Sequence, residues 1–204
     1  MAERNRTQTK QRFLDGLHNL LVRDGLKAVG INAIAREAKA DKALIYRYFG
    51  GLDGLFSDYV SQSFIWWRPE DLLAGEDSPT SPEKWLERVI RGQVQFLRTH
   101  PETLALLAWE PIERNALVIA LERVRKKRTQ ELAALLRPHF EEHPNADLID
   151  KASTLVSASI HYLAVRGRTI KTFGTLDIKS DQGWTTIEDT LIAMVSSLTA
   201  PPRK

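Results

Sequence analysis

The chain has 204 residues, a formal net charge of +3 and no cysteine. This length allows one or two compact domains, and a hydrophobic content of 43% is typical of a globular chain. Without thiols the chain can form no disulfide or thiolate metal site, which fits a reducing cytoplasm. No stretch approaches the roughly 20 apolar residues that span a bilayer, and the polar start MAERNRTQTKQR lacks the apolar block of a secretion signal. We therefore expect a cytoplasmic protein that makes no membrane contact.

The charge is unevenly distributed along the chain. Residues 1–50 hold ten Lys and Arg against five Asp and Glu, whereas residues 51–204 hold nineteen against twenty-one. A basic head on a slightly acidic remainder is typical of a polyanion-binding module attached to a second domain. Basic N-terminal arms are also common for other reasons, so the charge alone leaves both interpretations open.

Helical spacing of apolar residues dominates the N-terminal quarter. Residues 7–24 place one apolar stripe at offsets of three and four, and Gly25 suits a left-handed cap after that helix. The stripe consists of Phe13, Leu14, Leu17, Leu20 and Leu21. Two short helices follow on either side of a tight turn. Asp41 can cap the second of them, and Gly50 with Gly51 ends it.

The second short helix is the most informative part of the chain. Two short helices joined by a turn of three or four residues form a helix-turn-helix, whose second helix enters the major groove of DNA. Lys and Arg neutralise phosphates, Tyr hydroxyls donate to phosphate oxygens, and small apolar side chains can touch thymine methyl groups. The candidate DNA-binding residues are Asn32, Lys42, Ala43, Leu44, Tyr46, Arg47 and Tyr48. The alternative is an ordinary pair of helices with a solvated basic face.

Residues 7–55 resemble the N-terminal domain of the TetR/AcrR-type transcriptional regulators. The segment LIYRYF at 44–49 is similar to the family's recognition-helix signature TLYxHF, and IAREA at 34–38 is similar to IAxxAG. The resemblance implies a homodimeric regulator, most often a repressor, which leaves its operator when a small ligand binds the C-terminal domain. It also implies that Tyr46 and Tyr48 contact phosphates, with the first residues of the same helix toward the bases.

The chain departs from the family pattern at several positions. Lys39 stands where the family usually has Gly, and a left-handed conformation costs a non-Gly residue about 1 kcal/mol, so we expect a differently shaped turn. Leu44 and Tyr48 replace the usual Thr and His. Leu52 replaces a Lys that binds phosphate, which predicts the loss of that contact, and Gly30 replaces a capping Ser or Thr.

Helical spacing continues beyond the head, and no run predicts a strand. A helix from about Leu52 into Trp66-Trp67 should end before Pro69, and residues 69–82 form a Pro-, Gly- and acid-rich loop. Later helices are predicted at residues 82–100, 102–109, 116–136, 146–166 and 185–198. A polar loop covers 167–184, and a capping box at Thr185 and Glu188 should begin the last helix. The total is about nine helices.

Aromatic residues are dense between 56 and 109 and suit a cavity for an apolar or aromatic ligand. The candidate pocket residues are Phe64, Trp67, Phe96, Trp109, His161 and Tyr162. Each ring can equally be ordinary core packing. Glu110, Glu113 and Arg114 can pair with a polar ligand group or form a solvated ion cluster.

The last two helices carry apolar stripes that suit a dimer interface. The stripe on the helix 146–166 consists of Ala152, Leu155, Val156, Ser159 and Leu163. The stripe on the helix 185–198 consists of Ile187, Leu191, Met194, Val195 and Leu198. If these two helices packed against the same two helices of a second copy, the four would form a bundle around a two-fold axis. Both stripes can instead be internal core, and the family resemblance favours the dimer.

His139-Phe140-Glu141-Glu142-His143 matches the H-x-x-E-H pattern of some zinc peptidases. That chemistry needs the motif inside a helix, but Pro138 and Pro144 bracket it here and indicate a linker. We therefore expect no metal and no cofactor. Phosphate-binding Gly loops, dinucleotide fingerprints and the G-x-S-x-G elbow do not occur in the sequence either.

The predicted fold is all-α. Residues 1–51 would form a three-helix helix-turn-helix DNA-binding domain, and residues 52–204 a helical ligand-binding and dimerisation domain. The expected function is a repressor rather than an enzyme. Its expected partners are double-stranded operator DNA, a small-molecule effector of unknown identity and a second copy bound through the last two helices. An activator or nucleoid-type binder is a further possibility, as is a helical small-molecule-binding protein or enzyme whose basic head binds no DNA.

Overall fold

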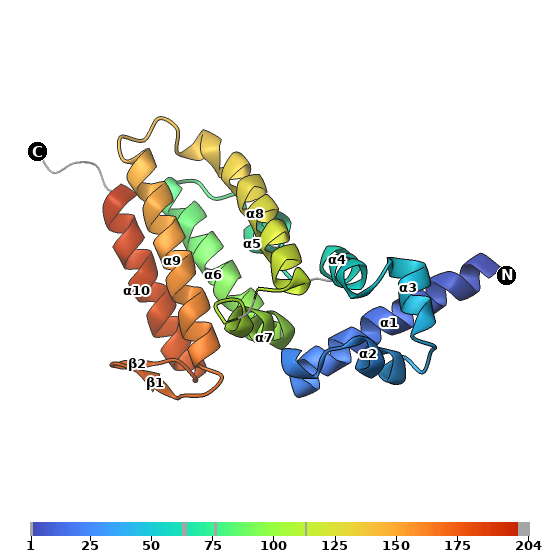
Figure 1. The fold of residues 1–204 in the computed structure, drawn as a ribbon. Coiled ribbons are helices and arrows are strands. Elements are labelled where there is room, and N and C mark those ends of the chain that lie inside the picture. The colour runs from blue at the N-terminus through green and yellow to red at the C-terminus, as the bar shows by residue number, and fades with distance from the viewer. Residues whose placement is uncertain (1, 63–64, 76, 113, 200–204) are drawn as a thin grey trace, which may run out of the picture. The chain divides into compact units, whose positions relative to one another are not determined.

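The computed structural model describes residues 2–62, 65–75, 77–112 and 114–199. Within them the chain forms ten α-helices, two 3₁₀ helices and one two-stranded hairpin (Figure 1). The α-helices are α1 (Ala2–Asp24), α2 (Ile31–Glu37), α3 (Ala43–Phe49), α4 (Leu52–Gln62), α5 (Pro69–Leu73), α6 (Pro82–Thr99), α7 (Pro101–Trp109), α8 (Ala116–Leu136), α9 (Ala146–Arg166) and α10 (Asp181–Thr199). The 3₁₀ helices are η1 (Leu26–Ala28) and η2 (Arg137–His139), and the hairpin pairs β1 (Thr172–Phe173) with β2 (Leu176–Asp177) in antiparallel fashion. The all-α prediction is confirmed.

The chain divides into two compact units. The head unit comprises residues 1–66 and 101–126, and the body unit comprises residues 67–100 and 127–204. The head unit therefore holds α4, α7 and the first part of α8 in addition to the helix-turn-helix. The predicted boundary at residue 51 divides the chain by function, into a DNA-binding and a ligand-binding domain. The two compact units are defined by contacts and do not test that division, so the boundary stays a prediction.

The core of the head unit joins α1 to the helix-turn-helix. The fully buried side chains include Phe13, Leu17, Leu21, Ile34, Ile45 and Leu55. The ring of Phe49 lies edge-on to that of Phe13, with centroids 6.2 Å apart. The predicted stripe on the first helix therefore does pack against the two short helices.

A glycine sets the spacing between α3 and α4. A Cβ atom on Gly54 would lie 1.8 Å from the carbonyl oxygen of Phe49, the last residue of α3. No side chain fits at that distance, so only glycine allows α4 to approach the end of α3 this closely. The orientation of α3 thus depends on a residue outside it.

The body unit is built around α6, which packs against α5, α9 and α10 (Figure 1). A Cβ on Gly92 would lie 2.9 Å from the Cα atom of Leu72, so glycine lets α5 lie directly on α6. Arg91 of α6 donates to Glu188 and Asp189 of α10, each at 2.9 Å. These ion pairs connect helices that are nearly one hundred residues apart in the chain.

The predicted loop 69–82 contains a helix that the sequence analysis missed. Pro69 occupies the first turn of α5, and the carboxylate of Asp71 accepts the backbone N–H of Arg68 at 2.9 Å. Pro followed by two acids is a start signal for a helix, so the signal was present. A helix of only five residues is marginal by itself, and packing on α6 stabilises it.

The start of the last helix was also predicted wrongly. α10 begins at Asp181, and the hydroxyl of Ser180 accepts the backbone N–H of Gly183 at 3.1 Å. Thr185 lies inside the helix and donates to the carbonyl oxygen of Asp181, while Glu188 binds Arg91. The predicted capping box therefore does not form, and part of the predicted loop is the β1–β2 hairpin.

Candidate nucleic-acid interface

The turn between α2 and α3 keeps a left-handed residue. Lys39 has φ of 48°, and within the described residues it is the one non-glycine residue with positive φ. The guanidinium of Arg12, on α1, donates to the carbonyl oxygens of Ala38 and Lys39 and so satisfies the end of α2. The expectation of a differently shaped turn is therefore wrong, because an arginine from another helix stabilises the left-handed conformation.

This strain predicts a stabilising substitution. Lys39→Gly should raise the free energy of unfolding by about 1 kcal/mol relative to Lys39→Ala, because only glycine relieves the left-handed strain. Both variants lose the same charge, so the alanine variant is the matched control. A thermal melt followed by circular dichroism should separate them by roughly 2–4 °C. Equal melting temperatures would contradict the left-handed assignment.

The N-terminus of α3 is held as the sequence predicts. Asp41 accepts the backbone N–H of Ala43 at 2.8 Å through its carboxylate, which satisfies one of the free donors of the first turn. At the other end Gly50 adopts φ of 77° and donates to the carbonyl oxygen of Tyr46 at 2.9 Å. Both ends of this short helix are therefore capped by local residues.

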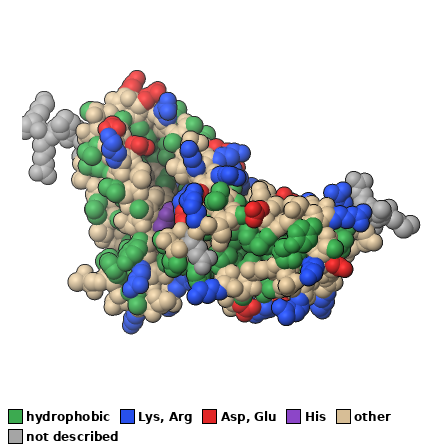
Figure 2. Space-filling model, in the orientation of Figure 1, with side chains coloured by type: hydrophobic (Ala, Val, Ile, Leu, Met, Phe, Trp, Pro, Cys, Tyr) green, Lys and Arg blue, Asp and Glu red, His purple; other side chains and the backbone are tan. Residues whose placement is uncertain are grey.

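The candidate DNA-binding residues lie together on α2 and α3. Tyr46 is 56% exposed. Asn32, Lys42, Ala43 and Arg47 are also exposed, whereas Leu44 and Tyr48 are half-buried. The Lys42 ammonium lies 3.4 Å from the side-chain oxygen of Asn32, which connects the starts of the two helices. Figure 2 shows Lys and Arg side chains gathered over the part of the head unit that carries α2, α3 and the start of α1.

Arg6 extends this surface and was missed from the sequence. Its guanidinium carbon lies 5.6 Å from the ring centre of Tyr48, and that of Arg47 lies 5.9 Å from the same ring. Arg6 is exposed on a helix that begins five residues earlier than predicted. The spacing of Arg6 and Lys10, one helical turn apart, was the available signal.

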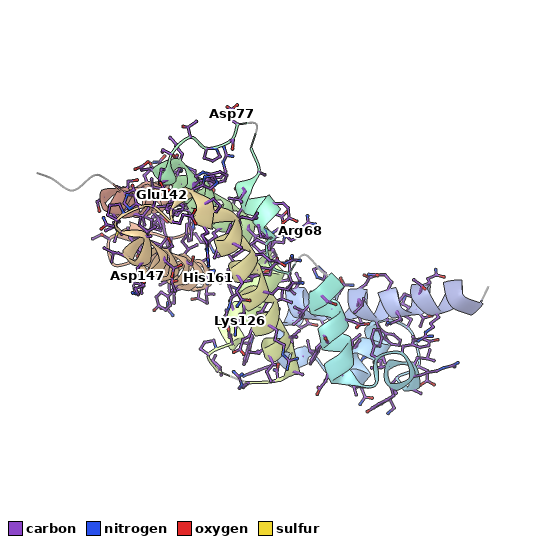
Figure 3. The ribbon with its side chains drawn as sticks, turned by 90° about the horizontal axis from the view of Figure 1, so that it is seen from above. Arg68, Asp77, Lys126, Glu142, Asp147 and His161 are labelled. Carbon is purple, nitrogen blue, oxygen red and sulfur yellow. The ribbon has the colours of Figure 1, made fainter. Side chains whose placement is uncertain are left out.

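The candidate pocket residues fall in both units. Trp67 and Phe96, in the body unit, are buried, His161 on α9 is half-buried (Figure 3), and Tyr162 is exposed. Trp109 belongs to the head unit, where the Lys27 ammonium lies 5.2 Å from its ring centre. Phe64 lies outside the described residues. The structure therefore does not gather the whole predicted set within one unit.

A buried amide is a candidate that the sequence analysis overlooked. Gln93 on α6 is only 3% exposed, and its side-chain oxygen has no hydrogen-bond partner among the described residues. An unsatisfied buried polar group is unfavourable by about 1–3 kcal/mol. The signal was a lone polar residue on the apolar stripe of Ile90 and Leu97.

The charged residues after α7 form ion pairs within the head unit. Glu110 accepts both guanidinium nitrogens of Arg125, and Arg114 donates to Glu122 at 2.9 Å. Glu113 lies outside the described residues. Glu110 and Arg114 therefore each form an ion pair with a partner outside the predicted trio.

The stripes on α9 and α10 are partly internal core. Their buried members are Val156, Leu163, Ile187, Leu191 and Val195. Two other members of the stripes are exposed instead, Leu155 at 70% and Met194 at 60%. Leu148 and Tyr162, outside the predicted stripes, are exposed on the same helix as Leu155. Figure 2 shows apolar side chains on the surface of this part of the body unit.

The two histidines of the H-x-x-E-H segment have separate contacts. His139 stacks on Trp85 with ring centres 4.4 Å apart, whereas His143 accepts the backbone N–H of Asn145 at 3.1 Å. The segment forms a 3₁₀ turn and loops rather than one α-helix, as the bracketing prolines indicate. Across the described parts of the chain, no helix is both long and apolar enough to cross a bilayer.

Comparisons with known proteins agree with this geometry. Residues 13–59 match the family model described as "Bacterial regulatory proteins, tetR family". The chain is 29% identical over 150 residues to the HTH-type transcriptional repressor SCO4008 of Streptomyces coelicolor, and the match covers 73% of each protein. Its fold is similar to that of NalD, the secondary repressor of the MexAB-OprM multidrug efflux pump in Pseudomonas aeruginosa, with a TM-score of 0.65 and 16% identity over 98% of this chain and 100% of that one. A TetR-like transcriptional regulator from Rhodococcus gives a TM-score of 0.58 and 20% identity over 94% and 93% of the two chains.

Proposed function

We propose that the chain is a TetR-type transcriptional regulator rather than an enzyme, in line with the family model and the repressor that it resembles, and that it is a cytoplasmic repressor that binds a near-palindromic operator as a homodimer. A small apolar or aromatic ligand bound in the helical body releases it. The observation that carries the proposal is the exposed surface of α3 and its N-cap residue, where Lys42, Tyr46 and Arg47 all reach solvent. Phosphate and groove contacts require such exposure.

The proposed DNA contacts follow from side-chain chemistry. Lys42, Arg47 and the additional Arg6 neutralise phosphates, while the hydroxyls of Tyr46 and Tyr48 donate to phosphate oxygens. Asn32 adds a polar contact, and Ala43 with Leu44 contributes apolar contacts to base edges. Two heads on one dimer would address half-sites roughly 34 Å apart in successive major grooves.

Mobility-shift titrations test this placement. Lys42→Ala should weaken operator binding about tenfold and reduce the slope of log affinity against log salt by about 1, because one phosphate contact disappears. Tyr46→Phe should weaken binding less and leave the slope unchanged. The control is Lys126→Ala, since Lys126 is exposed on α8, away from the α2–α3 surface in sequence (Figure 3). An unaltered affinity and slope for Lys42→Ala would argue against this use of α3.

The proposed dimer rests on the exposed stripe of α9. Leu148, Leu155 and Tyr162 are spaced by seven residues, so all three lie on one face of the helix. Exposed apolar side chains in a row are typical of a surface that another helix covers. The stripe therefore supports an isologous interface, in which the same face of two copies meets.

The charges along α9 favour an antiparallel meeting. Its N-terminal turns carry Asp147 and Asp150 against one Lys151, and Asp147 projects away from the neighbouring helices (Figure 3). Its C-terminal end and the following turn carry Arg166 and Arg168. An antiparallel pair brings opposite charges together, whereas a parallel pair brings like charges together.

The buried amide of Gln93 supports a ligand site within the body unit. A ligand that offers a donor to its unsatisfied oxygen would gain the hydrogen bond that the protein itself lacks. Release would then follow from movement of α4, the helix of the head unit that comes directly after α3 in the chain. Within the head unit α7 contacts α1. Thr103 of α7 also donates to the buried carbonyl oxygen of Ile65 at 2.6 Å, so a movement of α7 would be felt at α1 and at the segment after α4.

The effector can be sought by a thermal-shift screen of aromatic and apolar compounds. A true effector should raise the melting temperature and, at the same concentration, release operator DNA in a mobility-shift assay. Compounds that stabilise the protein without releasing DNA would argue against regulated release.

A further inference from the structure

The β1–β2 hairpin between α9 and α10 is firmly anchored at its base. Trp184 of α10 donates through its indole N–H to the carbonyl oxygen of Ile178 at 3.1 Å, and the Ile178 side chain is buried. Lys179 donates to the carbonyl oxygen of Gly167 at 3.1 Å. The backbone N–H groups of Lys179 and Ser180 and the hydroxyl of Ser180 all donate to Asp177 and lower the pKa of its carboxyl group. The base is thus fixed from both flanking helices.

The tip of the hairpin, in contrast, presents an aromatic ring to solvent. Phe173 is 41% exposed, and Gly174, with φ of 58°, makes the turn beside it. The Phe173 ring meets Tyr162 edge to face, with centroids 5.4 Å apart and an interplanar angle of 80°. Tyr162 is the last member of the exposed stripe on α9. The hairpin therefore extends that stripe by one more apolar side chain from outside the helix.

The spacing of the stripe fixes where this aromatic pair would lie in an antiparallel dimer. Leu155 is its middle member, seven residues from Leu148 and seven from Tyr162, or about 10 Å along the helix in each direction. A two-fold axis at Leu155 places Tyr162 opposite Leu148 of the partner subunit. The same rotation places the basic end of α9 over the acidic first turns of the partner's helix.

We propose that the β1–β2 hairpin is a dimerisation arm, in which Phe173, held by Tyr162, packs over Leu148 of the partner subunit. The inference rests on the proposed homodimer and adds to it a contact outside the helical bundle. The arm closes each end of the interface, because Phe173 covers apolar surface that the paired α9 helices leave open. A rigid base makes such a contact favourable, since little conformational freedom is lost on binding.

The absence of cysteine from the chain allows a direct test by disulfide trapping. In the double variant Phe173→Cys with Leu148→Cys, mild oxidation should link two subunits and give a covalent dimer on a non-reducing gel. Within one chain Phe173 lies beside Tyr162, with ring centroids 5.4 Å apart, and Tyr162 is fourteen residues from Leu148 on α9, about 21 Å. A disulfide needs Cα atoms within about 7 Å, so a link between positions 148 and 173 of one chain is excluded. Each single variant should give much less covalent dimer.

Two further variants separate the arm from the dimer itself. Leu155→Cys alone should cross-link to its own symmetry mate. Phe173→Ser should raise the dimer dissociation constant about tenfold in analytical ultracentrifugation, whereas Leu135→Ser should leave it unchanged, because Leu135 is also apolar and exposed but lies on α8. Folding of each variant is checked by circular dichroism.

The outcomes distinguish the two hypotheses. Cross-linking of the Phe173–Leu148 pair together with a weaker Phe173→Ser dimer supports the arm. A protein that sediments as a dimer, yet shows neither effect, overturns the arm and leaves the proposed homodimer intact. A wild-type chain that remains a monomer at all concentrations overturns both.

Discussion

Replacing Gly54 with alanine should weaken operator binding at least a hundredfold, although Gly54 is not one of the proposed DNA contacts. The added Cβ would lie 1.8 Å from the carbonyl oxygen and 2.9 Å from the carbonyl carbon of Phe49. Neither atom belongs to a flexible side chain, so the backbone at the end of α3 must move. We expect a loss of about 3 kcal/mol in unfolding free energy, at the upper end of the usual effect of overpacking.

The same shift should displace Tyr46 and Arg47, because α3 has only seven residues and moves as one piece. Operator affinity should therefore fall at least a hundredfold in a mobility-shift titration, even under conditions where the variant is still folded by circular dichroism. A displacement of about 1 Å already weakens hydrogen bonds to phosphates and base edges.

Gly30→Ala is the matched control for this prediction. Gly30 precedes α2 with an extended backbone that any residue adopts, and a Cβ there meets nothing within 4 Å. Its unfolding free energy should fall by less than about 1 kcal/mol, the scale of a change at an N-cap, and its operator affinity should remain close to that of the wild type. If Gly54→Ala melts and binds DNA as Gly30→Ala does, the close approach of α4 to Phe49 is not a feature of the protein in solution.

Much of the head could be predicted because its signals are local. The spacing of Phe13, Leu17 and Leu21 defines a helix face by itself. Asp41 caps α3 by a contact two residues along the chain, which sequence spacing also predicts. Side-chain chemistry and the resemblance to a known family added the proposed role of α3, which periodicity alone could not supply.

The features that were missed depend on contacts between distant segments. Arg12 stabilises the turn at Lys39 from twenty-seven residues away, and a lone arginine in a helix carries no mark of such a role. The need for glycine at position 54 appears only once α4 lies against Phe49. Such requirements arise from tertiary packing, which overrides the local pattern.

The body was harder to interpret because apolar stripes have more than one use. On α9, Val156 and Leu163 are buried in the body unit, whereas the neighbouring Leu155 is exposed. A sequence pattern locates an apolar face but does not say whether the same chain or another one covers it. Aromatic density has the same ambiguity, as the buried Trp67 and the exposed Tyr162 illustrate.

The second large effect is expected at Leu155, the middle of the proposed interface. Leu155→Glu should convert the proposed dimer into a monomer, because the two-fold axis would bring two carboxylates together in an apolar surface. At 70% exposure in the single chain, the side chain contributes little to folding of the protomer. The melting curve of the variant, measured at low protein concentration, should therefore stay close to that of the wild type.

Operator affinity of Leu155→Glu should fall about a hundredfold or more, since a monomer binds each half-site separately and loses the gain from linking two heads. Leu135→Glu is the control, because Leu135 is 55% exposed on α8 and takes no part in the proposed interface. Sedimentation velocity and a mobility-shift titration on an operator and on a single half-site measure both effects. The two variants should bind the half-site equally, and only Leu155→Glu should fail to gain from the second half-site. A dimeric Leu155→Glu with wild-type operator affinity would place the interface on another surface of the chain.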